Sequence, residues 1–268
     1  MRAILPADNL CPVAEGGIAM DRQPRYRSRM AAGAADIRAA RRLRYLAFRR
    51  GRDPAGLDGD GFDDLCRHVL IEEAATGRLV CCFRILPLRD GGEIGRSYSA
   101  QFYELSALAA FTGPMVEMGR FCLHPQARDP DILRVAWAAM TRIVDENGVE
   151  MLFGCSSFEG TDADPYRDAF AMLRARHLAP RRWWPRVKAP SVVRFARKLA
   201  RRGFDAKLAM RGMPPLLRTY LLMGGWVSDH AVVDHDMNTL HVFTGVEVSA
   251  IPPTRKRLLR ALAGAVAA

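Results

Sequence analysis

A carboxylate and a guanidinium stand three residues apart in an apolar stretch, residues 116–125. In a regular strand Glu117 and Arg120 would point to opposite faces. Gly119 between them is typical of a β-bulge, which would bring both side chains to one cleft. An apolar strand would raise the pKa of the glutamate and suit it to take a proton from an amine, whereas the guanidinium would lower that pKa. The sequence leaves two interpretations open, a catalytic pair and a buried salt bridge.

A Gly-rich stretch, residues 52–64, is expected to be a loop, and four aspartates crowd its second half: Asp58, Asp60, Asp63 and Asp64. Carboxylates in such a loop can bind an amine or a metal ion. The spacing of an EF-hand loop is absent, and the six histidines include no HExxH pair. We therefore favour an amine and expect no metal centre.

Ser156 and Ser157 follow an apolar run and could suggest a nucleophile. The GxSxG motif is absent, and no His/Asp pair is placed by a motif. We expect these serines to be polar groups that line the cleft.

Several short blocks stand in order along the chain: YSAQF at 98–102, EMGR at 117–120, LFGCSSFEG at 152–160, PLLRTYL at 215–221 and DMNT at 236–239. They resemble the bacterial ornithine-lipid N-acyltransferases. Part of the pattern also resembles the related acyl-homoserine-lactone synthases, namely Arg44, Phe48, Asp60, Asp63, Arg84, Glu117 and Arg120. The resemblance runs from about residue 37 to 245 and covers most of the chain.

This resemblance implies an α+β, GNAT-like acyltransferase fold with a mixed, mostly antiparallel sheet flanked by helices. The reaction it implies is transfer of a (3-hydroxy)acyl chain from acyl carrier protein to the α-amino group of L-ornithine, which gives lyso-ornithine lipid. Glu117 would be the catalytic base, with Arg120 beside it. The implied substrate-binding residues are Arg44, Phe48, Asp60, Asp63, Arg84, Ser156 and Ser157, although Arg44 and Arg84 could instead order the acidic loop.

The stretch after the catalytic strand, residues 126–131, contains no glycine. GNAT enzymes that use acyl-CoA normally carry a Gly-rich loop there, so an acyl carrier protein is the expected donor and no separate cofactor is required. The start of the following helix would offer backbone donors to the phosphate of the carrier's phosphopantetheine arm. Arg128 would contact that phosphate or the carrier's acids.

Two departures from the family pattern remove negative charge. Arg67 replaces the aspartate of the family's Cys-Asp-His motif, and His241 replaces the acidic residue that follows the family's Asn-Thr pair. Glutamine or another amino acid is therefore an alternative acceptor. An acyl-homoserine-lactone synthase is a further alternative, but that family's N-terminal loop tryptophan is missing.

The net charge of +11 favours an acidic partner. No helix-turn-helix, zinc-finger or RNP signature is present, which argues against nucleic acid. A basic, Trp-containing segment favours docking to the carrier or to an anionic membrane, through Arg181, Arg182, Trp183, Trp184 and Arg186. Scattered cysteines and the lack of an apolar leader favour a cytoplasmic enzyme, peripheral on the inner face of the bacterial cytoplasmic membrane.

Hydrophobic periodicity predicts helices at 35–50, 131–147, 164–177, 214–223 and 254–268, with a short one at 99–110. Strands are expected at 66–72, 79–86, 116–124, 149–155, 226–233 and 240–248. The sequence therefore predicts three parts: a loose leader at 1–33, an acyltransferase domain at 34–250 and a basic amphipathic tail at 251–268. The acyltransferase domain contains a basic helical segment at 181–223.

Overall fold

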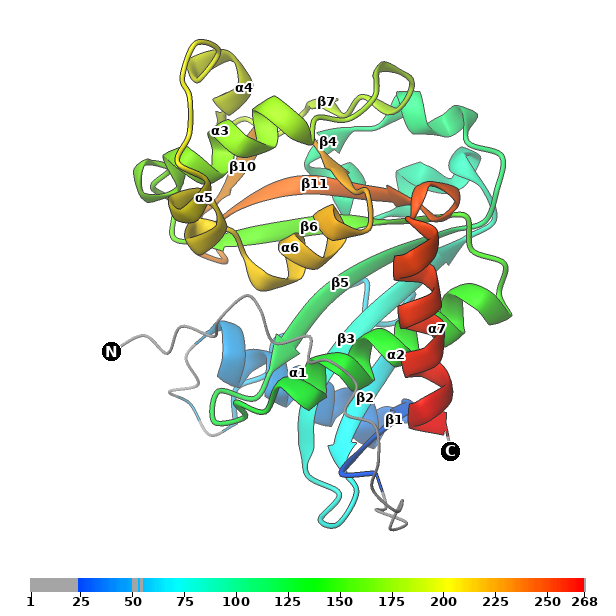
Figure 1. The fold of residues 1–268 in the computed structure, drawn as a ribbon. Helices are drawn as coiled ribbons and strands as arrows, with labels where there is room; N and C mark the ends of the chain where they lie inside the picture. Colours follow the sequence, from blue (N-terminus) through cyan, green and yellow to red (C-terminus); the bar gives the residue numbers. More distant parts are fainter. Residues whose placement is uncertain (1–23, 50–52, 54, 268) are drawn as a thin grey trace.

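The structure is a computed structural model that describes residues 24–49, 53 and 55–267. A mixed sheet runs through it (Figure 1), in the strand order β1 (Tyr26–Met30), β2 (Arg67–Glu73), β3 (Leu79–Leu88), β5 (Met115–Leu123), β6 (Met151–Glu159), β11 (Thr239–Glu247), β10 (Ala231–Asp234) and β8 (Val192–Val193). The short strand β9 (Trp226–Val227) also pairs with β11. Within this sheet β5 and β6 are parallel to each other, and the remaining neighbours are antiparallel.

Helices cover both faces of this sheet. On one face α2 (Pro130–Glu146) and α7 (Pro253–Ala267) lie side by side, and α6 (Pro215–Leu222) covers β11 (Figure 1). Val69 and Ile71 of β2 pack under α2, whereas Leu70 between them packs against α1 (Ala34–Phe48) on the opposite face. This alternation is the period of two that places successive strand residues on opposite faces.

The remaining elements are short. The helices α3 (Arg167–Arg176), α4 (Phe195–Lys198) and α5 (Ala206–Gly212) form a third apolar cluster with the ends of β6, β10 and β11. Strands β4 (Tyr103–Glu104) and β7 (Arg186–Val187) pair separately. Single 3₁₀ turns occupy Gly91–Arg96, Ser99–Gln101, Ser106–Ala110, Asp164–Tyr166, Arg181–Trp183 and Val248–Ala250.

Helix α2 begins and ends where its sequence dictates. The Asp129 carboxylate accepts a hydrogen bond from the Asp131 amide, and Pro130 occupies the first turn, where its missing N–H is not needed. Gly148 follows the helix with a positive φ of 58°, which favours glycine. The buried side chains between these ends recur at intervals of three and four, namely Ile132, Val135, Ala136, Ala139 and Met140.

The parallel strands β5 and β6 pair only at their beginnings. Residues 115–117 of β5 face residues 151–153 of β6, and the pairing ends at Glu117 and Phe153. Gly154 comes next, and a Cβ atom there would stand 2.3 Å from the Met118 carbonyl oxygen. The two strands therefore pass very close at Gly154 and then part, which opens the sheet at its centre.

Gly154→Ala is expected to destabilise the protein by about 2 kcal/mol or more, because its methyl group would overlap backbone and its φ of 157° is rarely adopted by residues with a side chain. Thermal unfolding measures the change. Gly264→Ala is the matched control, since the space around that helical glycine is open. Equal unfolding temperatures for the two variants would contradict the close approach at Gly154.

The predicted α+β, GNAT-like architecture is confirmed, and so are the β2–β3 hairpin and helices α1, α2, α6 and α7. Four details were wrong. The strand expected at 226–233 is two strands, β9 and β10. Residues 26–30 of the expected loose leader form the edge strand β1, while residues 1–23 lie outside the described part. The expected helix at 99–110 is two 3₁₀ turns separated by β4, and the segment 181–223 includes the strands β7 and β8.

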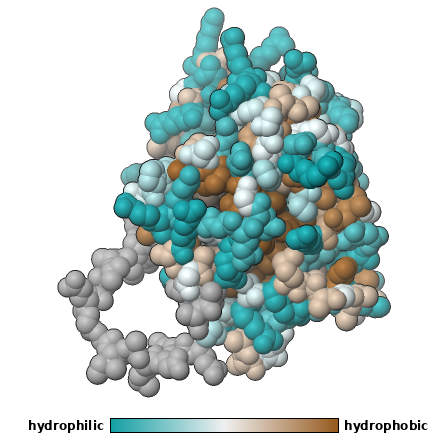
Figure 2. All heavy atoms as spheres, turned by 90° about the vertical axis from the view of Figure 1, so that its right-hand side faces the viewer, coloured by the Kyte–Doolittle hydropathy of each residue, from teal (hydrophilic) through white to brown (hydrophobic). Residues whose placement is uncertain are grey.

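Figure 2 shows hydrophilic side chains over most of one side, with apolar ones visible between them near its centre. Among the described helices, none combines the length and the apolar character that crossing a bilayer would require.

Candidate active site

A cavity of about 420 Å³ lies where β5 and β6 part. Its walls come from these two strands, the end of α1, helix α6 and the turn between β10 and β11. Segments that are more than a hundred residues apart in the sequence therefore meet around one space.

The two sides of this cavity differ in chemistry. One side is apolar and belongs to the cores under α2, α3 and α6, through Met118, Phe121, Phe158, Leu216, Leu217 and Tyr220. The other side carries polar groups, namely Arg84, Tyr98, Glu117, Arg120, Ser157, Asp234 and His241. The cavity can therefore hold a fatty chain and a polar acceptor at the same time, with the parting strands between them.

Glu117 lies in the wall of the cavity and is 4% exposed. Its Oε1 accepts hydrogen bonds from the Ser99 amide and hydroxyl, at 2.7 and 2.6 Å, and its Oε2 accepts one from the Tyr98 amide at 2.7 Å. Burial raises the pKa of Glu117 and outweighs these hydrogen bonds, which lower it. A carboxyl group with a raised pKa can exchange a proton closer to neutrality than an ordinary glutamate can.

Arg120 lies at a β-bulge, as the glycine beside it predicted. Cys82 pairs with Cys122 and Arg84 with Gly119, so Arg120 and Phe121 together face one residue of β3. Arg120 has a φ of 53°, which is uncommon outside glycine and is often found at functional sites.

Glu117 and Arg120 both reach this cavity, as the bulge predicted, but the alternative of a buried salt bridge between them is wrong. Arg120 donates to Asp60 at 3.0 Å and lies 3.5 Å from Asp58. Its guanidinium also stacks over the Tyr98 ring, 5.3 Å from the centroid. Both catalytic candidates thus line the same cavity, but each has its own partners.

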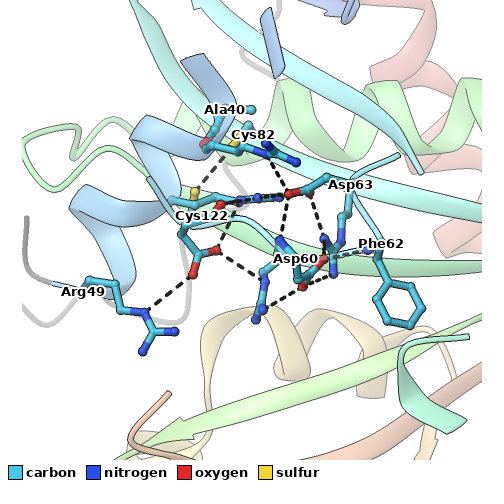
Figure 3. Close-up of polar contacts among 12 residues, drawn as sticks. Ala40, Arg49, Asp60, Phe62, Asp63, Cys82 and Cys122 are labelled. Carbon is cyan, nitrogen blue, oxygen red and sulfur yellow. Dashed lines mark hydrogen bonds and ion pairs between the residues drawn. The ribbon is translucent and has the colours of Figure 1, made fainter. Parts of the chain in front are cut away.

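The acidic loop is tied to arginines from three elements (Figure 3). Asp63 accepts two hydrogen bonds from Arg44 of α1, at 2.6 and 2.7 Å, and one from Arg84 of β3 at 2.9 Å. Asp60 accepts from Arg84 at 2.5 and 2.9 Å as well as from Arg120. Burial acts to raise the pKa of Asp63, but the hydrogen bonds and charge of Arg44, together with Arg84, hold it well below its usual range.

This arrangement corrects two of the expected substrate contacts. The side chains of Arg44 and Asp63 are 1% and 0% exposed and do not line the cavity, so neither can touch a substrate. Their role is the alternative one of ordering the acidic loop. Asp60, which is partly exposed, links that ordered loop to Arg84 and Arg120 in the cavity wall.

Phe48, Ser156 and Ser157 line the cavity as the sequence predicted. Ser156 accepts a hydrogen bond from the Thr244 hydroxyl at 3.0 Å. Cys155 also lines the cavity, but burial raises the pKa of its thiol to about 12. A thiol that stays protonated is a poor nucleophile, so the cavity favours direct transfer over a covalent acyl-enzyme.

Several polar residues of the cavity were not among the expected site residues, and three of them are Tyr98, Asp234 and His241. Tyr98 is the first residue of a block that carries the family resemblance, and His241 departs from the family pattern. The sequence therefore contained a signal for both residues. The sequence contained no signal for Asp234, because an acidic residue before a turn is usually solvated.

The expected docking residues lie outside the cavity. Arg128 is exposed in the loop before α2. At the start of that helix, the Asp129 carboxylate accepts a hydrogen bond from the Asp131 amide. A negative charge therefore occupies the helix start that was expected to bind a phosphate. Arg181, Arg182 and Arg186 are exposed. Trp183 and Trp184 are half-buried against the core that contains Tyr103 and Phe243.

Comparison with known proteins shows the family of this chain. The acetyltransferase (GNAT) domain family matches residues 43–138. An L-ornithine N(alpha)-acyltransferase of Rhodobacter capsulatus is 34% identical over 241 residues, which cover 84% of this chain and 91% of that protein. The chain belongs to the L-ornithine N(alpha)-acyltransferase family. This acyltransferase is also 27% identical to the member from Agrobacterium fabrum, over 84% of this chain and 81% of the other.

Solved structures similar to this acyltransferase include an N-acyl amino acid synthase from uncultured soil microbes. That chain is 13% identical, with a TM-score of 0.44, and the match covers 90% of this chain and 98% of the other. In the part of this acyltransferase that the structure describes, no three His, Cys, Asp or Glu side chains are grouped to hold a metal ion.

Proposed function

We propose that this acyltransferase moves a (3-hydroxy)acyl chain from acyl carrier protein to the α-amino group of L-ornithine and so makes lyso-ornithine lipid. The observation that carries the proposal is the two-sided cavity at the parting of β5 and β6, with an acyl-sized apolar side and a charged side. The substrate in the names of its relatives agrees with that chemistry.

The acyl chain lies on the apolar side, beside Phe121 and Leu216, and its thioester reaches the gap beyond Glu117. Beyond that point β5 and β6 no longer pair with each other, so backbone amide and carbonyl groups can bind the amides of a phosphopantetheine arm. The N–H groups of the bulge at Arg120 are suited to stabilise the oxyanion that forms during transfer.

Glu117 acts as the base. A free α-amino group is protonated near neutrality and must lose a proton before it attacks. Oε2 of Glu117 accepts one hydrogen bond, from Tyr98, and so keeps a lone pair for that proton. The nitrogen then attacks the thioester carbonyl, the C–N bond forms and the C–S bond breaks. The second proton that the nitrogen loses goes to the leaving thiolate, and Glu117 releases the first to water.

Arg120 binds the α-carboxylate of the acceptor. Its Nη2 and Nε face Asp60 and Asp58, and among the described residues none accepts a hydrogen bond from its Nη1. Arg84 adds a second positive charge in the same wall. Both guanidiniums are held by Asp60, so their positions are fixed before the substrate arrives.

The donor is a carrier-linked thioester, because the loop before α2 contains no glycine with which to approach a pyrophosphate closely. Arg128, Arg181, Arg182 and Arg186 supply exposed positive charge for an acidic carrier or for an anionic inner-membrane surface. The enzyme accordingly works as a peripheral protein on the cytoplasmic side of that membrane.

The test supplies the purified enzyme and L-ornithine with either a 3-hydroxyacyl carrier protein or the matching acyl-CoA. Mass spectrometry is expected to find acyl-ornithine with both, at a rate at least about tenfold higher with the carrier. Absence of an amide product with either donor would refute the reaction. Equal rates would refute the carrier preference alone.

A further inference from the structure

Three acceptor groups lie in a row on the polar side of the cavity: Asp234 of β10, His241 of β11 and Ser157 of β6. Val232 pairs with His241, and Asp234 follows Val232 by two residues, so Asp234 and His241 are diagonal neighbours on one sheet face. Ser157 pairs directly with His241 from the other side. The register therefore brings these side chains together without a loop between them.

His241, in the same cavity wall, has a ring nitrogen without a hydrogen-bond partner among the described residues. The Tyr103 hydroxyl donates to the His241 carbonyl oxygen at 2.8 Å, so His241 Nδ1, 3.1 Å from the same hydroxyl oxygen, carries the ring proton. Nε2 is then a pure acceptor, and it is buried without a hydrogen-bond partner in a side chain that is 2% exposed. Burial lowers the pKa of His241 to about 4, so the ring is neutral at pH 7.

Asp234 is a carboxylate without a counter-ion in the described structure. Its Oδ1 accepts from the Met237 amide at 2.9 Å, and no described Arg, Lys or His lies within ion-pair distance of it. Asp58, Asp60 and Asp63 of the acidic loop, by contrast, are all paired with arginines. A carboxylate in a cavity wall is most stable when a cation binds beside it.

We propose that Asp234 and His241 bind the side-chain ammonium of the acceptor amino acid and thereby select a cationic side chain. The inference rests on the proposed function and adds the part of the site that distinguishes ornithine from neutral amino acids. An ammonium group offers three N–H donors, and the carboxylate, His241 Nε2 and the Ser157 hydroxyl are three acceptors. A neutral glutamine side chain would leave the Asp234 carboxylate without a cation beside it. The replacement of the family's acidic residue by His241 therefore does not favour a neutral acceptor.

Calorimetry with L-ornithine and L-norvaline tests this directly, because norvaline has the same carbon chain without the terminal amine. The enzyme is expected to bind ornithine at least about 30-fold more tightly. Asp234→Asn should abolish that preference while keeping an oxygen for the Met237 amide. Asp236→Asn, in the same turn but outside the cavity wall, should keep it.

Equal binding of the two ligands, binding of neither, or a preference that survives Asp234→Asn would overturn the proposal. His241→Phe provides a second variant, which retains an aromatic ring beside Phe102 and should weaken ornithine binding more than norvaline binding. The reaction is tested separately: preferential binding of ornithine without any amide product would refute the proposed function and leave the ammonium site standing.

Discussion

Glu117→Gln is expected to lower kcat/KM for N-acylation of ornithine by about 10²–10⁴-fold, because the amide cannot take the proton of the attacking amine. In the unchanged enzyme the rate should fall as the pH drops and Glu117 becomes protonated. This fall should begin above the pH at which an ordinary glutamate titrates, since burial raises the pKa of Glu117. In the variant that acid limb should disappear from the pH profile of the residual activity.

The pH profile separates a base from a structural group. Glu117 also holds the amides of Tyr98 and Ser99, so Glu117→Gln can loosen that turn and lower the unfolding temperature. Glu146→Gln, at an exposed position of α2, is the control and should leave both rate and stability unchanged. A loss of less than about tenfold, or an unchanged acid limb in the variant, would exclude Glu117 from the base role.

Asp63→Asn is expected to lower the free energy of unfolding by about 3–5 kcal/mol. The side chain accepts hydrogen bonds from Arg44, Arg84 and Arg41, and Arg44 is almost completely buried. Removal of the negative charge leaves the buried Arg44 guanidinium with only the more distant carboxylate of Asp58, 3.4 Å away, as a counter-ion among the described residues. Urea unfolding measures the loss, and Asp64→Asn, next in the chain but exposed, should change stability by less than about 0.5 kcal/mol.

The ion pair of Asp63 with Arg44 predicts how the free energy of unfolding depends on pH. Because the pKa of Asp63 is lower in the folded protein than in the unfolded chain, its contribution is fully present above the unfolded value of about 3.9. This contribution to stability is lost as the pH falls below that value and through the lower pKa that Asp63 has in the folded protein. The stability difference between the enzyme and Asp63→Asn should therefore be constant near neutrality and shrink below about pH 4. A difference that grows towards acid would contradict the ion pair.

Local sequence patterns predicted the elements that build the site. Gly119 inside an apolar strand indicated the bulge at Arg120, because a strand interior seldom tolerates glycine without an irregularity. The Asp-Pro start and the Asn-Gly end of α2 likewise predicted that helix to within a residue or two. These signals are local, so neighbouring residues alone decide them.

The partners of charged side chains could not be predicted in the same way. Arg44 and Asp63 belong to the family pattern, yet only the packing of α1 against the sheet reveals that they are sealed from the cavity. The 3₁₀ turn at Ser99–Gln101 was expected to be part of a longer helix, because the carboxylate of Glu117 that accepts from the Ser99 amide is distant in sequence. Asp234 depends on the register of β10 with β11, which no local pattern encodes.

The most direct measurement is the site of acylation on L-ornithine labelled with ¹⁵N at the α-nitrogen only. With Arg120 at the carboxylate and Asp234 at the side-chain ammonium, the α-amino group lies nearest Glu117 and the thioester. Nuclear magnetic resonance of the purified product should show an amide proton coupled to ¹⁵N. An acyl group on the unlabelled δ-nitrogen, or a mixture of both products, would contradict this orientation of the acceptor in the cavity.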